Sequence, residues 1–284
     1  DSYKTNWDGT WMIDSHNGVK DLNIAPINIP RDYPVLFNHL ERFKEKLIKR
    51  QDKGDHWTNL RNCAYVKEFL KPKIIYQEIA VSMPFLFDEN EFFVDTTCFM
   101  MTSENEKLHF LTAVFNSSLF RTCFKNNFPE NSGNASRMKK VFFQKIPIKK
   151  PSETEAALFE KLVPMVQFAK KEKMEAEAAF LEEVIDACVM ELYFPEEAAA
   201  KNLKFIKPVT ALLEEINPSQ VIPPGESGSP RHEPSAEIIS EFHTRAGNPE
   251  HPIRERLNRL ATDSPDLFAV IKNEGKVKGN ATVL

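Results

Sequence analysis

The sequence predicts an α/β fold of the α+β type: a small, mostly antiparallel sheet with packed helices, followed by a helical hairpin and a helical tail. From Lys73 onward, three short segments rich in β-branched and aromatic residues alternate with turn formers: "KIIYQEI", "PFLFDEN" and "EFFVDTTCFMM". Long apolar stretches follow Ser103 and Ser152, each with Glu three residues later, which is the signature of a capped helix. A Pro/Gly/Ser-rich stretch over 217–234 then indicates a linker.

Composition limits the function classes. A chain of 284 residues with 42% hydrophobic content can bury a sizeable core. Nine Gly against 19 Pro and 22 Phe leave little material for Gly-rich phosphate loops, which disfavours a doubly wound nucleotide-binding fold. Residues 1–150 carry 22 Lys and Arg against 18 Asp and Glu, whereas the remainder carries 15 against 23. We therefore expect any polyanionic partner to meet the first half.

The four cysteines are widely spaced, and no Cys/His spacing suits zinc, so buried free thiols in a reducing cytosol are expected. No apolar run of 18 residues and no signal peptide occur, which predicts a cytoplasmic chain without a membrane span. The chain begins at Asp1 rather than with Met, and we expect it to be a piece of a longer polypeptide.

Three regions are predicted: 1–150, a helical hairpin region over 151–216, and a linker with a helical tail over 217–284. In the first, "WDGTWMIDSHNGV" predicts a strand that leads into a turn at Asn17-Gly18. Asp32 is the expected cap of one helix, with Pro34 in its first turn and Gly54 beyond its end. The apolar face of this helix is expected in the core and consists of Leu36, Leu40, Phe43 and Leu47.

Further helices are predicted by capping boxes and periodicity. Ser103 and Glu106 open one long helix, "EKLHFLTAVFNSSLFRTCFKN". Ser152 and Glu155 open the first of two antiparallel helices, in which Pro164 is a site for a kink. The buried stripes expected in the second hairpin helix and in the tail are Phe180, Leu181, Val184, Ile185, Cys188 and Leu192, then Ile253, Leu257 and Leu260. Ser264-Pro265 is expected to start a last helix.

Catalytic motifs are poorly supported. The seven His are scattered, and neither an Asn-Pro-Pro-aromatic loop nor a Gly-rich loop for a methionine cofactor occurs. Asp266 followed by Glu274-Gly-Lys276 imitates a Mg²⁺ nuclease site, but Ser264 as cap and Gly275 as stop favour a helix there. We therefore assign no catalytic residue and no metal ligand to this chain, and keep the nuclease as an alternative.

A basic stretch interleaved with aromatic and amide residues lies within 24 positions and comprises Arg50, Lys53, His56, Trp57, Asn59, Arg61, Asn62, Lys71 and Lys73. Arg can read guanine and Asn adenine through paired hydrogen bonds, while Lys and Trp suit backbone and stacking contacts. The alternative is a solvated helix end with a capped turn, because basic residues also favour helix C-termini.

The segment "RDYPVLFNHLERFKEKLIKRQDKGDHWTNLRNCAYVKEFLKPKIIYQEI" resembles the TaqI-like C-terminal specificity domain of adenine-specific methyltransferases and combined restriction–modification enzymes. The pattern is carried by Tyr33-Pro34, Leu40, Phe43, Trp57, Leu60-Arg61 and Lys71-Pro72-Lys73-Ile74. Downstream, "FFVDTTCFMMT", "LHFLTAVFNSSLF" and "QKIPI" follow the order of that family, and "FLEEVIDACVMELY" resembles a helix that often comes after it. The resemblance spans about residues 7–195, and the tail after 217 resembles no family that we can name.

The resemblance implies that residues 1–150 are a DNA target-recognition domain, whose partners are double-stranded DNA and a catalytic methyltransferase domain in the same polypeptide. That parent enzyme would use S-adenosylmethionine, with Mg²⁺ a further possibility, whereas this chain holds no cofactor itself. Arg61 is a candidate for a phosphate or a guanine contact, and Asn59 and Gln77 are candidate base readers. Trp57 is expected to be mainly a packing anchor of the domain and only secondarily a residue that stacks on DNA. The remaining DNA-binding candidates are Arg50, Lys53, Lys71, Lys73, Arg137, Lys139 and Lys140. The alternative outside DNA binding is a helical protein-interaction module.

Overall fold

The computed structural model describes residues 2–4, 9–20, 23–80, 84–94, 97–127, 136–138, 143–217 and 234–266. The chain divides into two compact units. Unit 1 comprises Asp1–Thr5, Pro72–Glu89 and Val94–Leu284, and unit 2 comprises Asn6–Lys71 and Asn90–Phe93. The region boundaries predicted at residues 150 and 216 do not coincide with the limits of these two units. The predicted regions stay a prediction.

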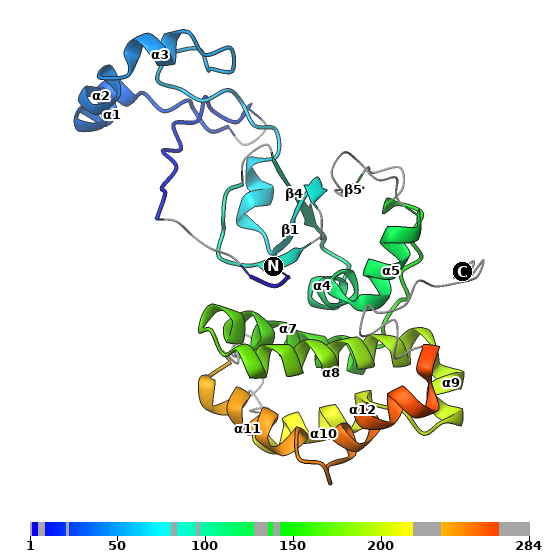
Figure 1. Ribbon diagram of the computed structural model, residues 1–284. Coiled ribbons are helices and arrows are strands. Elements are labelled where there is room, and N and C mark those ends of the chain that lie inside the picture. Colours follow the sequence, from blue (N-terminus) through cyan, green and yellow to red (C-terminus); the bar gives the residue numbers. More distant parts are fainter. Residues whose placement is uncertain are drawn as a thin grey trace. The chain divides into compact units, whose positions relative to one another are not determined.

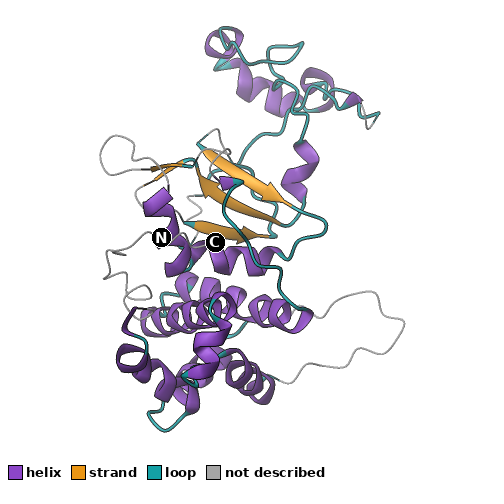
Figure 2. Cartoon of the chain, turned by 90° about the vertical axis from the view of Figure 1, so that its right-hand side faces the viewer, coloured by secondary structure: helices purple, strands orange, loops and turns teal. Residues whose placement is uncertain are grey.

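Unit 1 contains the predicted antiparallel sheet. Its strands are ordered β3 (Phe85–Asp88), β1 (Lys73–Gln77) and β4 (Cys98–Thr102), and Figure 2 shows the three side by side. A separate two-stranded sheet pairs β2 (Ile79–Ala80) with β5 (Ser136–Arg137). The α+β class and the strand segments expected from Lys73 onward are therefore confirmed.

Side-chain amides seal the outer edge of β3. Asn116 accepts a hydrogen bond from the Phe85 amide at 3.0 Å and donates one to the Phe85 carbonyl at 2.7 Å. Gln167 donates through Nε2 to the Phe87 carbonyl at 3.0 Å. These contacts occupy backbone groups that would otherwise template pairing with another strand.

The long helix predicted after Ser103 is wrong, because the chain breaks into α4 (Leu108–Asn116) and α5 (Ser118–Asn127). Ser117 is extended, with ψ 154°, and its hydroxyl accepts from the Phe120 amide at 3.1 Å, which starts a new helix. The Ser103 hydroxyl does accept from the Glu106 amide at 2.9 Å, but α4 begins only at Leu108. Local side-chain bonds to the backbone override the apolar period here.

The hairpin α7 (Glu153–Lys171) and α8 (Glu175–Tyr193) forms as predicted, and the capping box at Ser152 and Glu155 is present in full. The helix continues through Pro164. The stripe residues expected in α8 are all buried. The described helices after the hairpin include α9 (Pro195–Ala200), α10 (Ile206–Ile216), α11 (Ala236–Ala246) and α12 (Pro252–Asp263). Figure 1 shows α10, α11 and α12 along one side of the hairpin.

One core runs through unit 1. It extends from Ile74 and Phe85 of the sheet to Phe159 of α7, and on to Ile253, Leu257 and Leu260 of α12, as the tail periodicity predicts. Ser264 is buried and donates a hydrogen bond to Glu197 at 3.0 Å. The linker predicted over 217–234 and the last predicted helix lie for the most part outside the described residues.

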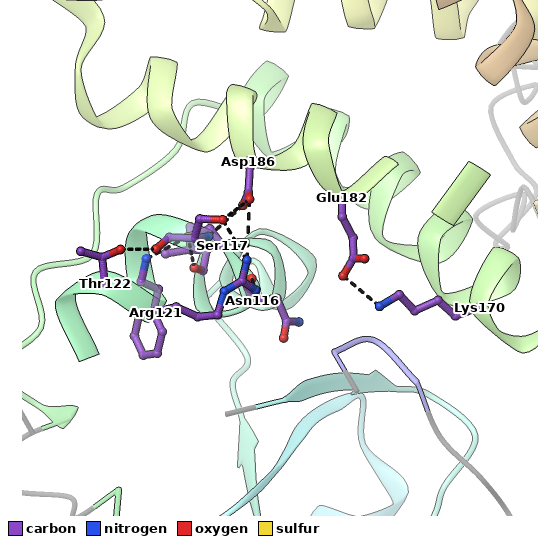
Figure 3. A network of polar contacts seen from close by, with 10 residues as sticks. Asn116, Ser117, Arg121, Thr122, Lys170, Glu182 and Asp186 are labelled. Atoms are coloured by element: carbon purple, nitrogen blue, oxygen red, sulfur yellow. Dashed lines mark hydrogen bonds and ion pairs between the residues drawn. The ribbon is translucent and has the colours of Figure 1, made fainter. Parts of the chain in front are cut away.

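A buried polar corner joins α4 and α5 to α8. In Figure 3 the carboxylate of Asp186 points from α8 toward this corner, with Arg121 beside it. The Ser118 amide donates to Asp186 at 2.9 Å, the Ser118 hydroxyl donates to the same carboxylate, and Arg121 Nη2 lies 3.8 Å from it. Burial nevertheless raises the pKa of Asp186 from 3.8 to about 6, against the lowering effects of Ser118 and Arg121.

This pKa predicts that unit 1 loses stability between about pH 4 and pH 6. The folded protein binds the Asp186 proton more tightly than the unfolded chain, so the contribution is complete below pH 3.8 and lost as the pH rises through about 6. Between pH 4.5 and 7 we expect the free energy of unfolding to fall by about 2 kcal/mol more in the parent than in Asp186→Asn. Urea unfolding at the two pH values measures this difference, and an equal change in both proteins would contradict it.

Unit 2 departs most from expectation. The single predicted helix is instead α1 (Ile29–Asp32), α2 (Pro34–Glu41) and α3 (Lys44–Ile48), with a 3₁₀ helix, η2 (Val66–Leu70), further on. Pro34 does occupy the first turn of α2, but Asn28 caps α1 and Asp32 pairs with Arg31 at 2.6 Å. The face expected in the core is not buried, since Phe43 is 42% exposed and Leu36, Leu40 and Leu47 are half-buried.

The strand predicted before Asn17-Gly18 is also wrong for the described part of 7–29. Residues 11–18 form no strand, and only an isolated bridge joins Val19 to Ile24. No turn is assigned at Asn17-Gly18 either, although Gly18 has φ +80° and a Cβ there would meet Ile24 O at 2.9 Å, so the position favours glycine.

Candidate nucleic-acid interface

A polar hub organises unit 2, and we define it as Ser15, Thr58 and Asn59, whose side chains are at most 3% exposed. The Ser15 hydroxyl donates to the Thr58 carbonyl at 2.8 Å, and the Leu60 amide donates to the Ser15 carbonyl at 2.9 Å. The hub therefore ties two segments of chain that are 43 positions apart. Among its described residues, unit 2 buries only two apolar side chains, Ile29 and Phe69, so the hydrogen bonds of the hub are a main determinant of its local fold.

Asn59 is the centre of the hub. Its Nδ2 donates to the carbonyls of Ile27 at 2.8 Å and His16 at 3.2 Å, and its Oδ1 accepts from Thr58 Oγ1 at 2.9 Å. Both amide protons are thus used inside the unit, and the residue is 2% exposed. This geometry does not support the base-reading role predicted for Asn59 and makes it a positioning residue.

Arg50 binds the backbone of the segment that contains Thr58 and Asn59 of the hub. Its Nη2 donates to the carbonyls of Trp57 at 3.0 Å and Asn59 at 3.3 Å, from a half-buried position. Lys53 is exposed and donates to the Ile48 carbonyl at 2.7 Å. Carbonyl partners leave both positive charges uncompensated by these bonds, so each side chain positions the loop and adds to its positive potential.

Trp57 lies on the same loop and packs against neighbouring rings. Its ring centroid is 5.7 Å from Phe37 and 5.4 Å from His56. The Lys44 ammonium lies 5.6 Å from the indole centroid, within cation–π range. The indole is half-buried and anchors α2 and α3 to the loop.

Several cationic side chains of unit 2 face solvent. Arg61 is exposed, with Nη1 3.3 Å from Asp52, and Lys71 pairs with Glu68 at 2.9 Å. Lys46 and Lys49 are exposed, and no described residue forms an ion pair with either. These two lysines are not among the DNA-binding candidates predicted from the sequence, and the density of basic residues around α3 is the signal that could have identified them.

The remaining predicted candidates belong to unit 1, whereas the hub belongs to unit 2. Lys73 is fully buried, with Nζ 2.6 Å from Asp88, so this geometry does not support the predicted phosphate contact. Gln77 is exposed at the end of β1, and Arg137 of β5 is exposed and donates to Glu78 at 2.8 Å. The other two candidates, Lys139 and Lys140, lie outside the described residues.

Two titratable residues with strongly shifted pKa values, His109 and Asp186, belong to packed parts of the fold and not to a candidate catalytic site. Burial lowers the pKa of His109 to about 4, and its ring lies 3.9 Å from the Phe87 ring, centroid to centroid. Asp186 is likewise held in the core. Within the described ranges, no group of three His, Cys, Asp or Glu side chains is placed to hold a metal ion.

None of the helices in the described part of the chain combines the length and apolar character that a membrane crossing requires. The four cysteines are free thiols, of which Cys188 is buried and the others are half-buried.

Comparison with known proteins places the resemblance on a defined range. Residues 21–148 match the family model described as the TaqI-like C-terminal specificity domain, whereas no curated protein matches the chain. The matched range contains the loop that bears Lys53, Trp57 and Arg61, which we call the basic loop, and also the three-stranded sheet. It ends before α7. The resemblance inferred from the sequence is thus confirmed: over residues 21–148 the chain matches the TaqI-like C-terminal specificity domain.

Proposed function

We propose that this chain recognises duplex DNA sequence-specifically, as the specificity part of an adenine-specific DNA methyltransferase or restriction–modification enzyme. The observation that carries the proposal is the basic, aromatic-bearing loop that Asn59 and Arg50 hold in place, inside the range that matches a specificity domain. A rigid frame with exposed cations suits DNA recognition, because phosphate contacts position a protein and side chains then read base edges.

The exposed residues divide into two roles. Lys46, Lys49 and Lys53 suit phosphates, since each is an exposed cation on or next to α3. Arg61 is exposed beside Asp52 and suits a guanine or a phosphate. Gln77 is a second candidate reader, on unit 1.

The catalytic step belongs to another part of the proposed parent polypeptide. There a methyltransferase domain would bind S-adenosylmethionine and act on an adenine turned out of the duplex. No residue of this chain is assigned to that cofactor or to Mg²⁺, and the described residues offer no metal-ligand cluster. We place the protein in the cytoplasm, in agreement with its free cysteines.

Charge removal around α3 tests the phosphate contacts. We expect Lys46→Gln/Lys49→Gln to weaken duplex binding and to reduce the slope of log K against log salt by roughly 1.8, about 0.9 for each lost contact. Fluorescence anisotropy of a labelled mixed-sequence duplex, titrated at several salt concentrations, measures both quantities.

The matched control is Lys204→Gln/Lys207→Gln, which removes two exposed lysines at and just before α10. This control should bind DNA as the parent does. An equal effect of both pairs would show that only net charge matters and would contradict the proposed interface.

The described helices outside the match favour DNA recognition over a protein-interaction module. Among the described residues after Phe99, Ile148 is the one exposed large hydrophobic side chain, at 37%. Protein docking faces usually expose larger apolar patches. The nuclease alternative rests on Glu274 and Lys276, which lie outside the described residues, and Mg²⁺-dependent cleavage lost in Asp266→Ala would support it.

A further inference from the structure

Unit 2 exposes an unusual number of large apolar side chains. Eleven of the fourteen exposed large hydrophobic residues in the described chain belong to it, and its buried apolar residues are Ile29 and Phe69. Single exposed apolar residues are normal, whereas contiguous ones mark an interaction site. Three of the eleven are consecutive: Trp11 is 81% exposed, Met12 52% and Ile13 41%. We call Trp11–Ile13 the apolar tip.

The hub anchors the apolar tip. The Ser15 amide donates to the Ile13 carbonyl at 2.9 Å, and Ser15 itself is 3% exposed and bonded to Thr58 and Leu60. The tip is therefore only two residues from a buried anchor. Because the anchor limits the conformations of the adjoining residues, an exposed apolar run beside it loses little conformational entropy when it binds a partner.

The surroundings of the hub indicate what the tip meets. Residues 42–61 carry seven Lys and Arg against three Asp and Glu, a net charge of +4. The same hub holds the segment that bears Lys53 and Arg61. A protein groove for an apolar tip has no need of this positive charge, whereas DNA offers phosphates to the cations and base faces to the apolar groups.

We propose that the apolar tip, Trp11 with Met12 and Ile13, inserts against the base stack of duplex DNA as a wedge at one base step. This inference rests on the proposed function and adds a residue set that lies outside the matched range 21–148. Apolar wedges partly unstack a step and bend the duplex, so they read its deformability rather than its base edges. The tip would thus contribute specificity at a position that no hydrogen bond reaches.

Tryptophan emission tests the insertion directly. The chain has three Trp and five Tyr, and Trp7→Phe/Trp57→Phe leaves Trp11 as the sole tryptophan, which is excited selectively at wavelengths that Tyr does not absorb. We expect saturation with a fluorescein-labelled mixed-sequence duplex to remove most of the Trp11 emission, while dye anisotropy reports binding in the same titration. Heparin, a polyanion without bases, should bind the cationic surface and leave the emission unchanged.

Variants of the tip supply a second readout. Trp11→Ala alone should weaken duplex binding about ten-fold, the loss expected for one stacking contact, with an unchanged salt slope. Val35→Ala is the control, because Val35 is 84% exposed on α2 of the same unit, and it should bind as the parent does.

The outcomes separate the two proposals. Duplex binding with unchanged Trp11 emission and unchanged affinity in Trp11→Ala would overturn the wedge, leave DNA recognition standing and point to a protein surface as the tip's partner. Absence of any anisotropy change in the parent chain would overturn both.

Discussion

Replacing Lys73 by Met is expected to lower the free energy of unfolding by about 3–5 kcal/mol, because it removes the cation that pairs with the buried Asp88 carboxylate. Lys73 Nζ lies 2.6 Å from the Asp88 carboxylate, with the two side chains 0% and 1% exposed. The pair joins β1 to β3, since the two residues are directly opposite in the sheet. Chemical denaturation of the full chain, followed by circular dichroism, measures the loss.

Two companion variants show whether the cost arises from a stranded charge. Lys73→Met/Asp88→Leu should recover most of the loss, because a well-packed apolar pair replaces a buried ion pair at little cost. Lys71→Met removes a lysine whose pair with Glu68 is partly exposed and should change stability by less than about 1 kcal/mol. A double variant as unstable as Lys73→Met would refute this account of the pair.

Replacing Asn59 by Ala is expected to cost unit 2 about 1–3 kcal/mol, because the part-buried carbonyls of Ile27 and His16 each lose the Asn59 amide donor, and only the His16 carbonyl keeps another, the Ile27 amide. DNA binding should fall with it, since the loop that carries Trp57 and Arg61 loses its anchor. Hydrogen exchange of the unit 2 amides reports the local loss of order, and duplex anisotropy reports the binding.

Asn62→Ala is the matched control from the same stretch, because Asn62 is exposed. We expect it to change stability by less than about 0.5 kcal/mol. If Asn59→Ala kept the exchange protection of the parent and lost DNA binding alone, Asn59 would be a base reader after all.

Local patterns predicted the elements whose stability comes from regular packing. The strands β1, β3 and β4 follow from short β-branched and aromatic segments between turns, and α7 follows from the capping box at Ser152. The α12 stripe follows from helical spacing in the same way. In each case the information lies within a few neighbouring residues, which is why sequence reasoning found it.

Long-range contacts account for what the sequence did not reveal. Asn59 binds the carbonyls of residues 32 and 43 positions away, and Lys73 meets a carboxylate on another strand. Either side chain looks like an exposed polar group until its distant partner is known. The breaks at Phe43 and Ser117 escaped prediction for a different reason, because the apolar period continues across both.

Selection from a randomised duplex pool tests the central claim most directly. The full chain is incubated with the pool at near-physiological salt, bound duplexes are recovered over several rounds, and the enriched sequences are read. Sequence-specific recognition for adenine modification predicts enrichment of one short motif that contains adenine. Recovery of bound duplexes without any enriched motif, or no recovery at all, would contradict it.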